Sequence, residues 1–515
     1  NNAAPEIEKL LIDSYVNSRN YDLALKILEK KIGSQYDGAL QKLNYMKAIA
    51  LFQNGAFEES IAFFERSVKK NIDPTIEANC LYWSALAKYE MNNFKEVISD
   101  LKFFNRHPFA QKVNGFETLN YHMAYAYFKL KNHEAARNTF EQYLKQSIPN
   151  PSYQRDAFLR MGDSDFVLGN YWPAMESYEK SIQLNKQKGM YALYQKALSY
   201  GFVDRNLKKI EALNRLIADY PKTSLLDDTY FEMALAYTRE KNINQALVTY
   251  DFLINNFPES PYRSRAFLNK GLILYNSESL EESMEVLKKL ILEYPNEEVV
   301  QQALKTAKEI SIDLATVDVF ASWVKQLKGV TIEENELEQA SFRSAERLFN
   351  DNKKKAALKA FSSYLKEYPN GTNQLQAHFL CAELYFQDGK WGSAVEHYKK
   401  VIEQPTNEYS EQSLVRITQA IVNSELAISA LPYWKNLEKI AQFDENKRYA
   451  LFNLMQIYHN QEQFLEAIAY AQKVLLLNAL APKIKWDAYR VLARSAVAIK
   501  DLSLIHISEP TRLGM

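Results

Sequence analysis

Residues 157–182 read AFLRMGDSDFVLGNYWPAMESYEKSI, and this stretch decides the fold of the chain. Its apolar residues recur every three or four positions on either side of residues 169–170, which is the spacing of one helix face. A Gly-Asn pair such as 169–170 favours a turn. Gly162 and Ala174 lie where two helices would approach closely, and Tyr178 is large enough to fill the space beside them. The stretch therefore predicts an antiparallel helix hairpin.

The same pattern recurs along almost the whole chain with a period of about 37 residues. In each copy a large apolar residue is followed three positions later by a small one, and four positions further on by another apolar one, which is large in every copy named below except the last. The cleanest copies are Phe57, Ser60, Phe64; Tyr171, Ala174, Tyr178; Ile243, Ala246, Tyr250; Leu280, Ser283, Leu287; Trp391, Ala394, Tyr398; and Phe464, Ala467, Ala471. Self-similarity at this period predicts an array of stacked hairpins in which each repeat contacts its neighbours.

Several second helices are predicted to end at an aromatic residue followed by proline. These pairs are Tyr220-Pro221, Phe257-Pro258, Tyr294-Pro295 and Tyr368-Pro369. Proline cannot continue a helix and disfavours the helical region for the residue before it, so each pair marks a repeat boundary. With its small and aromatic residues in this order and its closing proline, the pattern resembles the tetratricopeptide repeat. The resemblance implies an all-α fold, a right-handed superhelical solenoid of antiparallel helix hairpins.

A second resemblance is narrower and concerns the linkers between repeats. The form FPESPY at residues 257–262 is similar to bacterial cell-envelope repeat proteins, which include outer-membrane assembly lipoproteins and periplasmic partners of the Tol system. This resemblance implies a periplasmic or outer-membrane-associated protein that takes part in envelope assembly or maintenance.

The repeat pattern weakens over residues 298–336. Phe320 takes the place of the small residue there, and Lys328-Gly-Val-Thr331 with the acidic stretch behind it indicates a hinge, the alternative being a degenerate repeat. The predicted organisation has an N-terminal repeat array at residues 1–297, this degenerate repeat at 298–336 and a C-terminal repeat array at 337–501.

The last residues, 502–515, are predicted to be a non-native tail outside the fold. Residues 502–512, LSLIHISEPTR, resemble the translation of a sequencing-library adapter. Before them, residues 482–500 show the pattern of a first helix with no second helix after it, and the chain begins without Met. We therefore expect the sequence to be an internal fragment of a longer protein.

Composition and charge narrow the classes of function. The 63 basic and 63 acidic side chains cancel, so no overall field attracts nucleic acid or anionic lipid. No apolar stretch approaches the roughly 20 residues that cross a bilayer. Cys80 and Cys381 are far apart and belong to no CxxC pair, which is typical of buried small hydrophobic residues.

Catalytic and cofactor motifs are missing from the sequence. It has no phosphate-binding GxxxxGK[ST] loop, GxGxxG, HExxH or GxSxG motif. The seven histidines are scattered, and adjacent acidic pairs such as Glu58-Glu59 point to different sides of a helix. We therefore predict no catalytic residue, no metal site and no cofactor, and a protein that is not an enzyme.

Aromatic residues on first helices are the candidate partner-binding residues. In the tetratricopeptide repeat family some first-helix positions face the groove of the solenoid, and the resemblance places seven aromatic residues there: Tyr45, Phe52, Tyr82, Tyr89, Tyr121, Tyr125 and Phe128. They would offer an apolar groove with phenolic hydroxyls to a peptide or a partner helix. The competing interpretation is that these aromatic residues only pack between neighbouring repeats.

Three readings of the function follow. The first is a non-catalytic protein-protein interaction scaffold that binds a peptide or partner segment in the groove of the solenoid, in the bacterial envelope. The second is the regulatory or substrate-recruiting arm of a larger enzyme whose catalytic domain lies outside this sequence. The third is a structural spacer that binds nothing.

Overall fold

The computed structural model describes residues 10, 13–31, 33–146, 151–327, 329, 331–424, 430–478 and 480–501. Within these residues all regular secondary structure is helical, and the chain divides into two compact units, Asn1–Ala266 (unit 1) and Phe267–Met515 (unit 2). The predicted tail at 502–515 lies outside the described residues, as do Lys328 and Val330 of the predicted hinge. The three-part organisation with a hinge at 298–336 stays a prediction.

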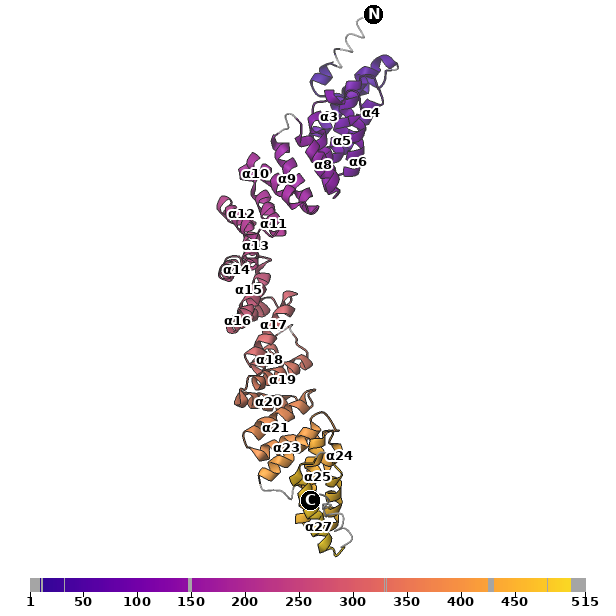
Figure 1. The fold of residues 1–515 in the computed structure, drawn as a ribbon. Coiled ribbons are helices and arrows are strands. Elements are labelled where there is room, and N and C mark those ends of the chain that lie inside the picture. Colours follow the sequence, from indigo (N-terminus) through magenta and orange to yellow (C-terminus); the bar gives the residue numbers. More distant parts are fainter. Residues whose placement is uncertain are drawn as a thin grey trace, which may run out of the picture. The chain divides into compact units, whose positions relative to one another are not determined.

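Unit 1 is a series of helix hairpins, each with a first and a second helix (Figure 1). Its first helices are α3 (Asp37–Gln53), α5 (Pro74–Glu90), α7 (Leu119–Lys129), α9 (Pro151–Val167), α11 (Met190–Phe202) and α13 (Leu226–Arg239). Its second helices are α2 (Tyr21–Leu28), α4 (Phe57–Val68), α6 (Phe94–Asn105), α8 (His133–Leu144), α10 (Tyr171–Leu184), α12 (Asn206–Asp219) and α14 (Ile243–Asn256). Short 3-10 helices stand at η1 (Ser34–Tyr36), η2 (Ala110–Lys112), η3 (Phe116–Thr118) and η4 (Lys186–Lys188).

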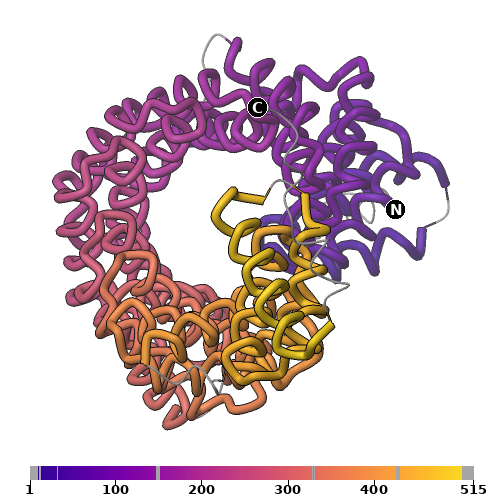
Figure 2. The backbone as a smooth tube through the Cα atoms, turned by 60° about the horizontal axis from the view of Figure 1, so that its bottom comes forward, coloured from indigo at the N-terminus to yellow at the C-terminus, as the bar shows by residue number. Residues whose placement is uncertain are grey.

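Unit 2 repeats this arrangement. Helix α15 (Arg263–Asn276) contains the boundary between the units, and it is followed by α16 (Leu280–Glu293), α17 (Val299–Asp313), α18 (Val317–Val324), α19 (Glu334–Asn350), α20 (Lys354–Glu367), α21 (Gln374–Gln387), α22 (Trp391–Ile402), α23 (Ser410–Asn423), α24 (Leu431–Ile440), α25 (Asp444–Asn460), α26 (Phe464–Leu475) and α27 (Pro482–Ala498). The hairpins of each unit can be followed in chain order by colour in Figure 2.

The predicted all-α array of antiparallel helix hairpins is confirmed. Within unit 1, first helices such as α5 and α9 pack against the second helix of their own repeat and against that of the preceding repeat, and α21 and α25 do the same within unit 2, so the core of each unit runs along the stack. The second helices α12, α14, α16 and α20 end at Asp219, Asn256, Glu293 and Glu367, directly before the four aromatic-proline pairs. Proline thus ends these helices where the sequence predicted.

The close approach of two helices beside Tyr178 is also confirmed. A methyl group at Gly162 would lie 2.7 Å from the Tyr178 ring, which is closer than real side chains approach. Tyr178 and Ala174 are both fully buried. A further copy places Gly271 against Leu287, where the same methyl group would lie at 2.5 Å. The small residues are therefore required by the large side chains that fill the space opposite them.

The turns inside the hairpins share one backbone feature, a residue with positive φ. Gly55, Gly169 and Gly389 adopt φ values of 78°, 79° and 70°. Other hairpins place non-glycine residues there: Asn92, Lys131, Asp204, Lys241, Glu278, Ala315, Asn352 and Glu462. The Gly169 turn was readable from sequence, whereas the left-handed conformation at lysine or glutamate positions is imposed by the packing of the two helices.

Neighbouring repeats are also joined by a polar contact that the sequence did not predict. Glu338, near the start of α19, accepts hydrogen bonds from the backbone N–H of Thr372 at 2.6 Å and from the Tyr364 hydroxyl at 2.8 Å. Glu411 receives the backbone N–H groups of Gln442 and Phe443 at 2.9 and 3.2 Å in the same way. A side chain of one repeat thereby satisfies amides that precede the next first helix.

Replacing Glu338 with Ala is therefore expected to destabilise unit 2 by roughly 1–3 kcal/mol, because buried donors lose their acceptor. Urea unfolding followed by circular dichroism measures this loss. Gln339→Ala is the matched control, since Gln339 lies on the same helix and is exposed, and it should stay within about 0.5 kcal/mol of the parent chain. Equal stability of the two variants would contradict the role assigned to Glu338.

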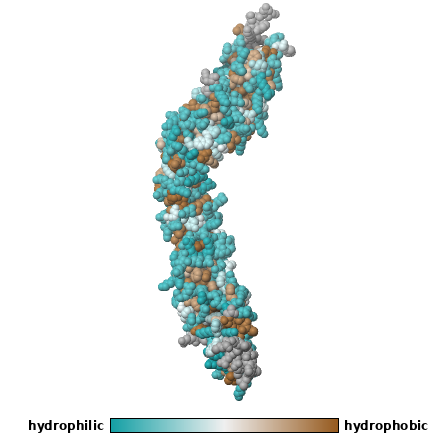
Figure 3. Space-filling model, viewed as in Figure 1, coloured by the Kyte–Doolittle hydropathy of each residue, from teal (hydrophilic) through white to brown (hydrophobic). Residues whose placement is uncertain are grey.

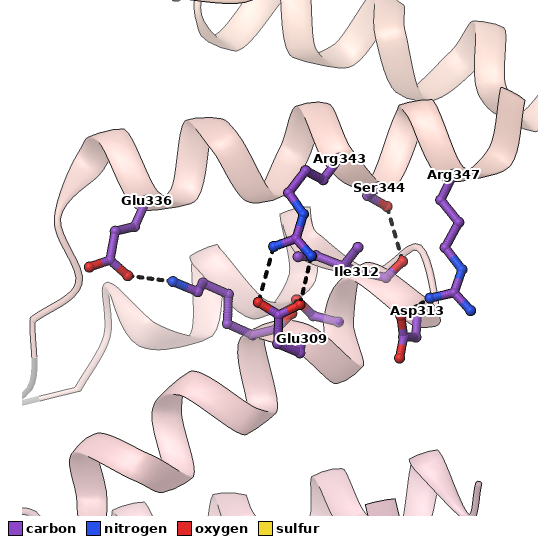
Figure 4. A network of polar contacts seen from close by, with 9 residues as sticks. Glu309, Ile312, Asp313, Glu336, Arg343, Ser344 and Arg347 are labelled. Atoms are coloured by element: carbon purple, nitrogen blue, oxygen red, sulfur yellow. Dashed lines mark hydrogen bonds and ion pairs between the residues drawn. The ribbon is translucent and has the colours of Figure 1, made fainter. Parts of the chain in front are cut away.

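At the weakened repeat, α17 and α19 contact each other directly across the short helix α18. Figure 4 shows the polar contacts: Arg343 forms a bidentate ion pair with Glu309 at 3.0 and 3.1 Å, Arg347 pairs with Asp313, and Lys308 pairs with Glu336. Three ion pairs thus join α17, which lies inside the predicted hinge segment, to α19, which begins at its end. Phe320 of α18, which takes the place of the small residue of the repeat, is buried, with 1% of its surface exposed.

Candidate partner-binding face

The first helices of unit 1 form its inner face. Each contacts the next along the series α3, α5, α7, α9, α11 and α13. Among the described residues of unit 1, successive second helices, such as α4 and α6, contact each other less extensively than successive first helices do. A stack curves toward the side on which its elements lie closer together. The surface of α5, α7, α9, α11 and α13, hereafter the first-helix face, is therefore the side on which one extended segment can contact several repeats.

The structure divides the seven predicted aromatic residues by exposure. Tyr45, Phe52, Tyr89, Tyr125 and Phe128 are partly exposed. Tyr82 and Tyr121 are buried, with 1% and 6% of their surface exposed. The partner-binding role of all seven residues stays a prediction. The two buried residues, Tyr82 and Tyr121, also make contacts that join neighbouring repeats.

Tyr82 joins two successive repeats. Its hydroxyl lies 2.9 Å from the Gly115 carbonyl oxygen and 2.7 Å from the Thr118 hydroxyl, both of which precede α7. Burial raises the pKa of Tyr82 to about 12, so the phenol stays protonated. This residue holds the repeats in register beneath the first-helix face.

Four of the predicted residues come together in one aromatic cluster. The ring of Tyr89 lies 5.7 Å from that of Tyr125, and Tyr125 lies 6.3 Å from Phe128. Tyr121 lies 6.2 Å from Tyr125 and also contacts Tyr153 of α9 at 4.4 Å. These separations are those of favourable aromatic pairs. The cluster spans α5, α7 and α9.

The other two predicted residues lie apart from this cluster. Tyr45 packs against Phe64 at 6.3 Å within its own hairpin. Phe52 packs against Trp83 at 5.2 Å, one repeat further along. The predicted set is thus one cluster of four residues, the buried Tyr82 and two separate packing contacts.

A polar strip that the sequence analysis missed continues from the aromatic cluster along α9. The Tyr121 hydroxyl donates to Asp156 at 2.8 Å, and Arg160 lies 3.5 Å from Asp156 and 2.9 Å from Asp163. Asp163 also accepts from the Tyr191 hydroxyl of α11 at 3.2 Å. The i, i+4, i+7 spacing of the three charged residues was the available signal, because it places them on one helix face.

Electrostatics fix the ionisation of this strip. Burial raises the pKa of Asp163, while the neighbouring Arg160 guanidinium opposes that rise. Burial alone would lower the pKa of Arg160, but Asp156 and Asp163 raise it above its usual value. Burial and the Asp163 carboxylate raise the pKa of Tyr191 to about 12. The strip therefore places the charged Arg160 guanidinium between Asp156 and Asp163, next to the phenol of Tyr191, which stays protonated.

Beyond α11 the first-helix face becomes acidic. The Tyr262 hydroxyl donates to Asp228 at 2.7 Å, and Glu232 is paired with Lys209 of α12. Burial, with Asp228 and Glu232 nearby, raises the pKa of Tyr194. Tyrosine and carboxylate side chains therefore alternate along the face up to α13.

Other kinds of site find little support in the described residues. They contain no group of three or more His, Cys, Asp and Glu side chains placed to hold a metal ion. Cys80 and Cys381 are buried free thiols, and burial raises the pKa of both to about 12, which keeps them protonated and unreactive. Among the same residues, no helix combines the length and the apolar character that a bilayer crossing requires.

The surface seen in Figure 3 is mainly hydrophilic, with hydrophobic residues in separate patches. Exposed Trp172, Phe202 and Leu207 lie at the hairpin turns of the α9–α12 region, away from the strip of α9 and α11 described above. The first-helix face differs from these patches because its aromatic residues are combined with fixed polar groups.

Comparison with solved structures found partial matches of low sequence identity. The C-terminal part of a tetratricopeptide repeat-containing protein from Cytophaga hutchinsonii is 16% identical, with a TM-score of 0.41, covering 50% of this chain and 99% of that one. A tetratricopeptide repeat protein from Parabacteroides merdae is 13% identical, with a TM-score of 0.33, covering 59% and 98%. The Naa15/Naa10 structure bound to HypK is 14% identical, with a TM-score of 0.40, covering 91% and 75%.

Sequence comparisons match a known repeat in four stretches of the chain. No curated protein matches the chain. Models described as tetratricopeptide repeat match residues 10–73, 118–147, 228–260 and 264–297. These stretches include hairpins of both units. These four stretches of the chain are therefore similar to tetratricopeptide repeats.

Proposed function

We propose that this chain is a non-catalytic protein-protein interaction scaffold whose first-helix face in unit 1 holds an extended segment of a partner protein. The observation that carries the proposal is the continuous strip from Tyr89 through Tyr121, Asp156 and Arg160 to Tyr191. It crosses four successive first helices, and its side chains are already fixed by contacts with one another.

Preorganisation is the physical basis of this binding. Neighbouring helices are spaced by about 8–10 Å, so an extended peptide of about three residues reaches from one first helix to the next. Tyrosine faces bury apolar side chains, and the fixed carboxylates accept hydrogen bonds from the peptide. Since the strip is ordered before binding, little ordering cost falls on the scaffold.

Removing the exposed parts of the strip tests the proposal. The double variant Tyr125→Ala, Tyr191→Ala should weaken partner binding at least tenfold, equivalent to about 1.4 kcal/mol. A photo-crosslinking residue placed at 191 in cell extract should capture the partner for identification, and titration with that purified partner measures the affinity. The helical signal should stay that of the parent chain.

Trp172→Ala with Leu207→Ala is the matched control, because both side chains are exposed, at 56% and 64%, on second helices. The proposal fails if this control loses affinity and the Tyr125, Tyr191 variant does not. If neither double variant changed the affinity for the partner, the partner would bind another surface of the chain.

The envelope location rests on the short motif at residues 257–262 alone. We propose it as the setting of the scaffold, and fractionation of the source cells with an antibody to the chain tests it. Recovery in the cytoplasmic fraction would remove the envelope setting and leave the interaction role untouched. The reading as a regulatory or substrate-recruiting arm of an enzyme stays a prediction.

A further inference from the structure

A cavity of about 640 Å³ lies in unit 1 between the end of α2, the start of α3 and the end of α4. Its walls carry four basic residues against two acidic ones: Lys31, Arg66, Lys69 and Lys70 against Glu29 and Asp37. The cavity is separate from the strip proposed above, which begins at α5. Nothing in the repeat pattern predicted it, because its residues stand at helix ends and in the linker before α3.

Two of its cations lack a carboxylate partner. Lys70 pairs with Asp37 at 2.8 Å. Arg66 and Lys69, both exposed, form no ion pair with any described residue, and Arg66 stacks over the Phe63 ring at 4.8 Å. Asp37 and Leu40 of the first turn of α3 also lie on the wall. The cavity is therefore electropositive.

Asn44 supplies a second and independent sign of a ligand. Its side chain is 3% exposed and lines the cavity. The amide nitrogen donates to the Leu40 carbonyl oxygen at 2.8 Å, which fixes the orientation of the amide. The Oδ1 atom is buried without a hydrogen-bond partner among the described residues. A buried acceptor of this kind is unfavourable unless a donor from outside reaches it.

The size of the cavity decides between an ion and a peptide. Asp37 and Asn44 are seven residues apart on α3, a separation of about 10 Å along the helix axis. An inorganic anion is too small to reach from the Asp37 end of the cavity to the Asn44 end. An extended peptide of about three residues spans it, since each residue adds about 3.3 Å.

We propose that this cavity binds an acidic peptide segment of a partner protein. The anionic side chains of the segment lie against Arg66 and Lys69, and one of its backbone N–H groups donates to Asn44 Oδ1. The side chains are carboxylates or phosphates, which share the chemistry that these cations recognise.

Fluorescence anisotropy with the full chain tests the proposal. Labelled peptides of one length carry three aspartates, three phosphoserines or three asparagines at their centre. We expect the two anionic peptides to bind at least tenfold tighter than the asparagine peptide, with affinity falling as salt rises. Arg66→Glu with Lys69→Glu should abolish this preference, and Lys95→Glu with Lys222→Glu, at exposed positions elsewhere, should preserve it.

The other outcomes overturn the proposal. Equal binding of the asparagine peptide would show that charge does not select the ligand. Displacement of the acidic peptides by millimolar inorganic phosphate at the same ionic strength would identify an ion site. Unchanged binding in the charge-reversal variant, with native helical signal, would place the peptide elsewhere. Because Tyr125 and Tyr191 lie outside the cavity, the Tyr125, Tyr191 variant should bind the acidic peptides normally, which separates this proposal from the first.

Discussion

Gly162→Ala is expected to destabilise unit 1 by about 2 kcal/mol, although alanine is a better helix former than glycine. The added methyl group would lie 2.7 Å from the Tyr178 ring. That ring cannot move aside easily, because it is fully buried and its hydroxyl donates to Asp163 at 3.0 Å. Overpacking of this kind costs about 1–3 kcal/mol and exceeds the gain of up to about 1 kcal/mol from helix propensity.

Gly392→Ala makes the same chemical change in the first turn of α22, where a methyl group meets nothing within 4 Å. It should stabilise unit 2 by up to about 1 kcal/mol. Urea unfolding of the three chains, followed by circular dichroism, measures both effects. Opposite signs are the expected result. A neutral or stabilising Gly162→Ala would mean that the two helices of this hairpin do not approach as closely as described.

Acidification is expected to destabilise unit 1 through His122, by up to about 3 kcal/mol between pH 6.5 and pH 4. Burial lowers the pKa of His122 to about 4. Its Nδ1 lies 3.0 Å from the Thr118 carbonyl oxygen, so Nδ1 carries the proton of the neutral ring. The rings of Tyr89, Tyr121 and Tyr153 pack against it.

The direction of the effect follows from proton binding. Unfolded His122 titrates near 6.5 and folded His122 near 4, so between these values the unfolded chain binds the extra proton. Stability is therefore complete above pH 6.5 and is lost as the pH falls toward 4. Each unit of pKa difference corresponds to about 1.4 kcal/mol.

The measurement compares the parent chain with His122→Phe, in urea at several pH values between 7.5 and 4.5. Other histidines and the carboxylates titrate in both chains, so the difference between the two curves isolates His122. The variant should be less stable at pH 7.5, because the hydrogen bond to Thr118 is lost, yet it should lose less stability on acidification. Parallel curves would show that His122 keeps an ordinary pKa in the folded chain.

The repeat pattern predicted the array of helix hairpins because two local features of the sequence specify where each helix packs and where it ends. Helical spacing of large and small residues defines which faces meet, as at Gly162 and Tyr178, and proline after an aromatic residue ends the second helix, as at Tyr220-Pro221. Both features act within a few residues, so the sequence displays them directly.

The candidate binding face was predicted only in part. The aromatic cluster of Tyr89, Tyr121, Tyr125 and Phe128 was in the predicted set, because repeats place such residues at fixed positions. The burial of Tyr82 was not predicted, since it depends on the Gly115 carbonyl oxygen and Thr118 in the following repeat.

The sequence by itself determined the repeat, its hairpin and most of its boundaries, because helix spacing and proline geometry are local. Only the tertiary structure decided which polar groups come together: Asp163 with Tyr191 across α9 and α11, and the Ser67 hydroxyl with the Gln41 carbonyl oxygen across α4 and α3. These contacts join residues more than 20 positions apart. Their distances depend on how each hairpin stacks on the next, which the side chains of both repeats set jointly.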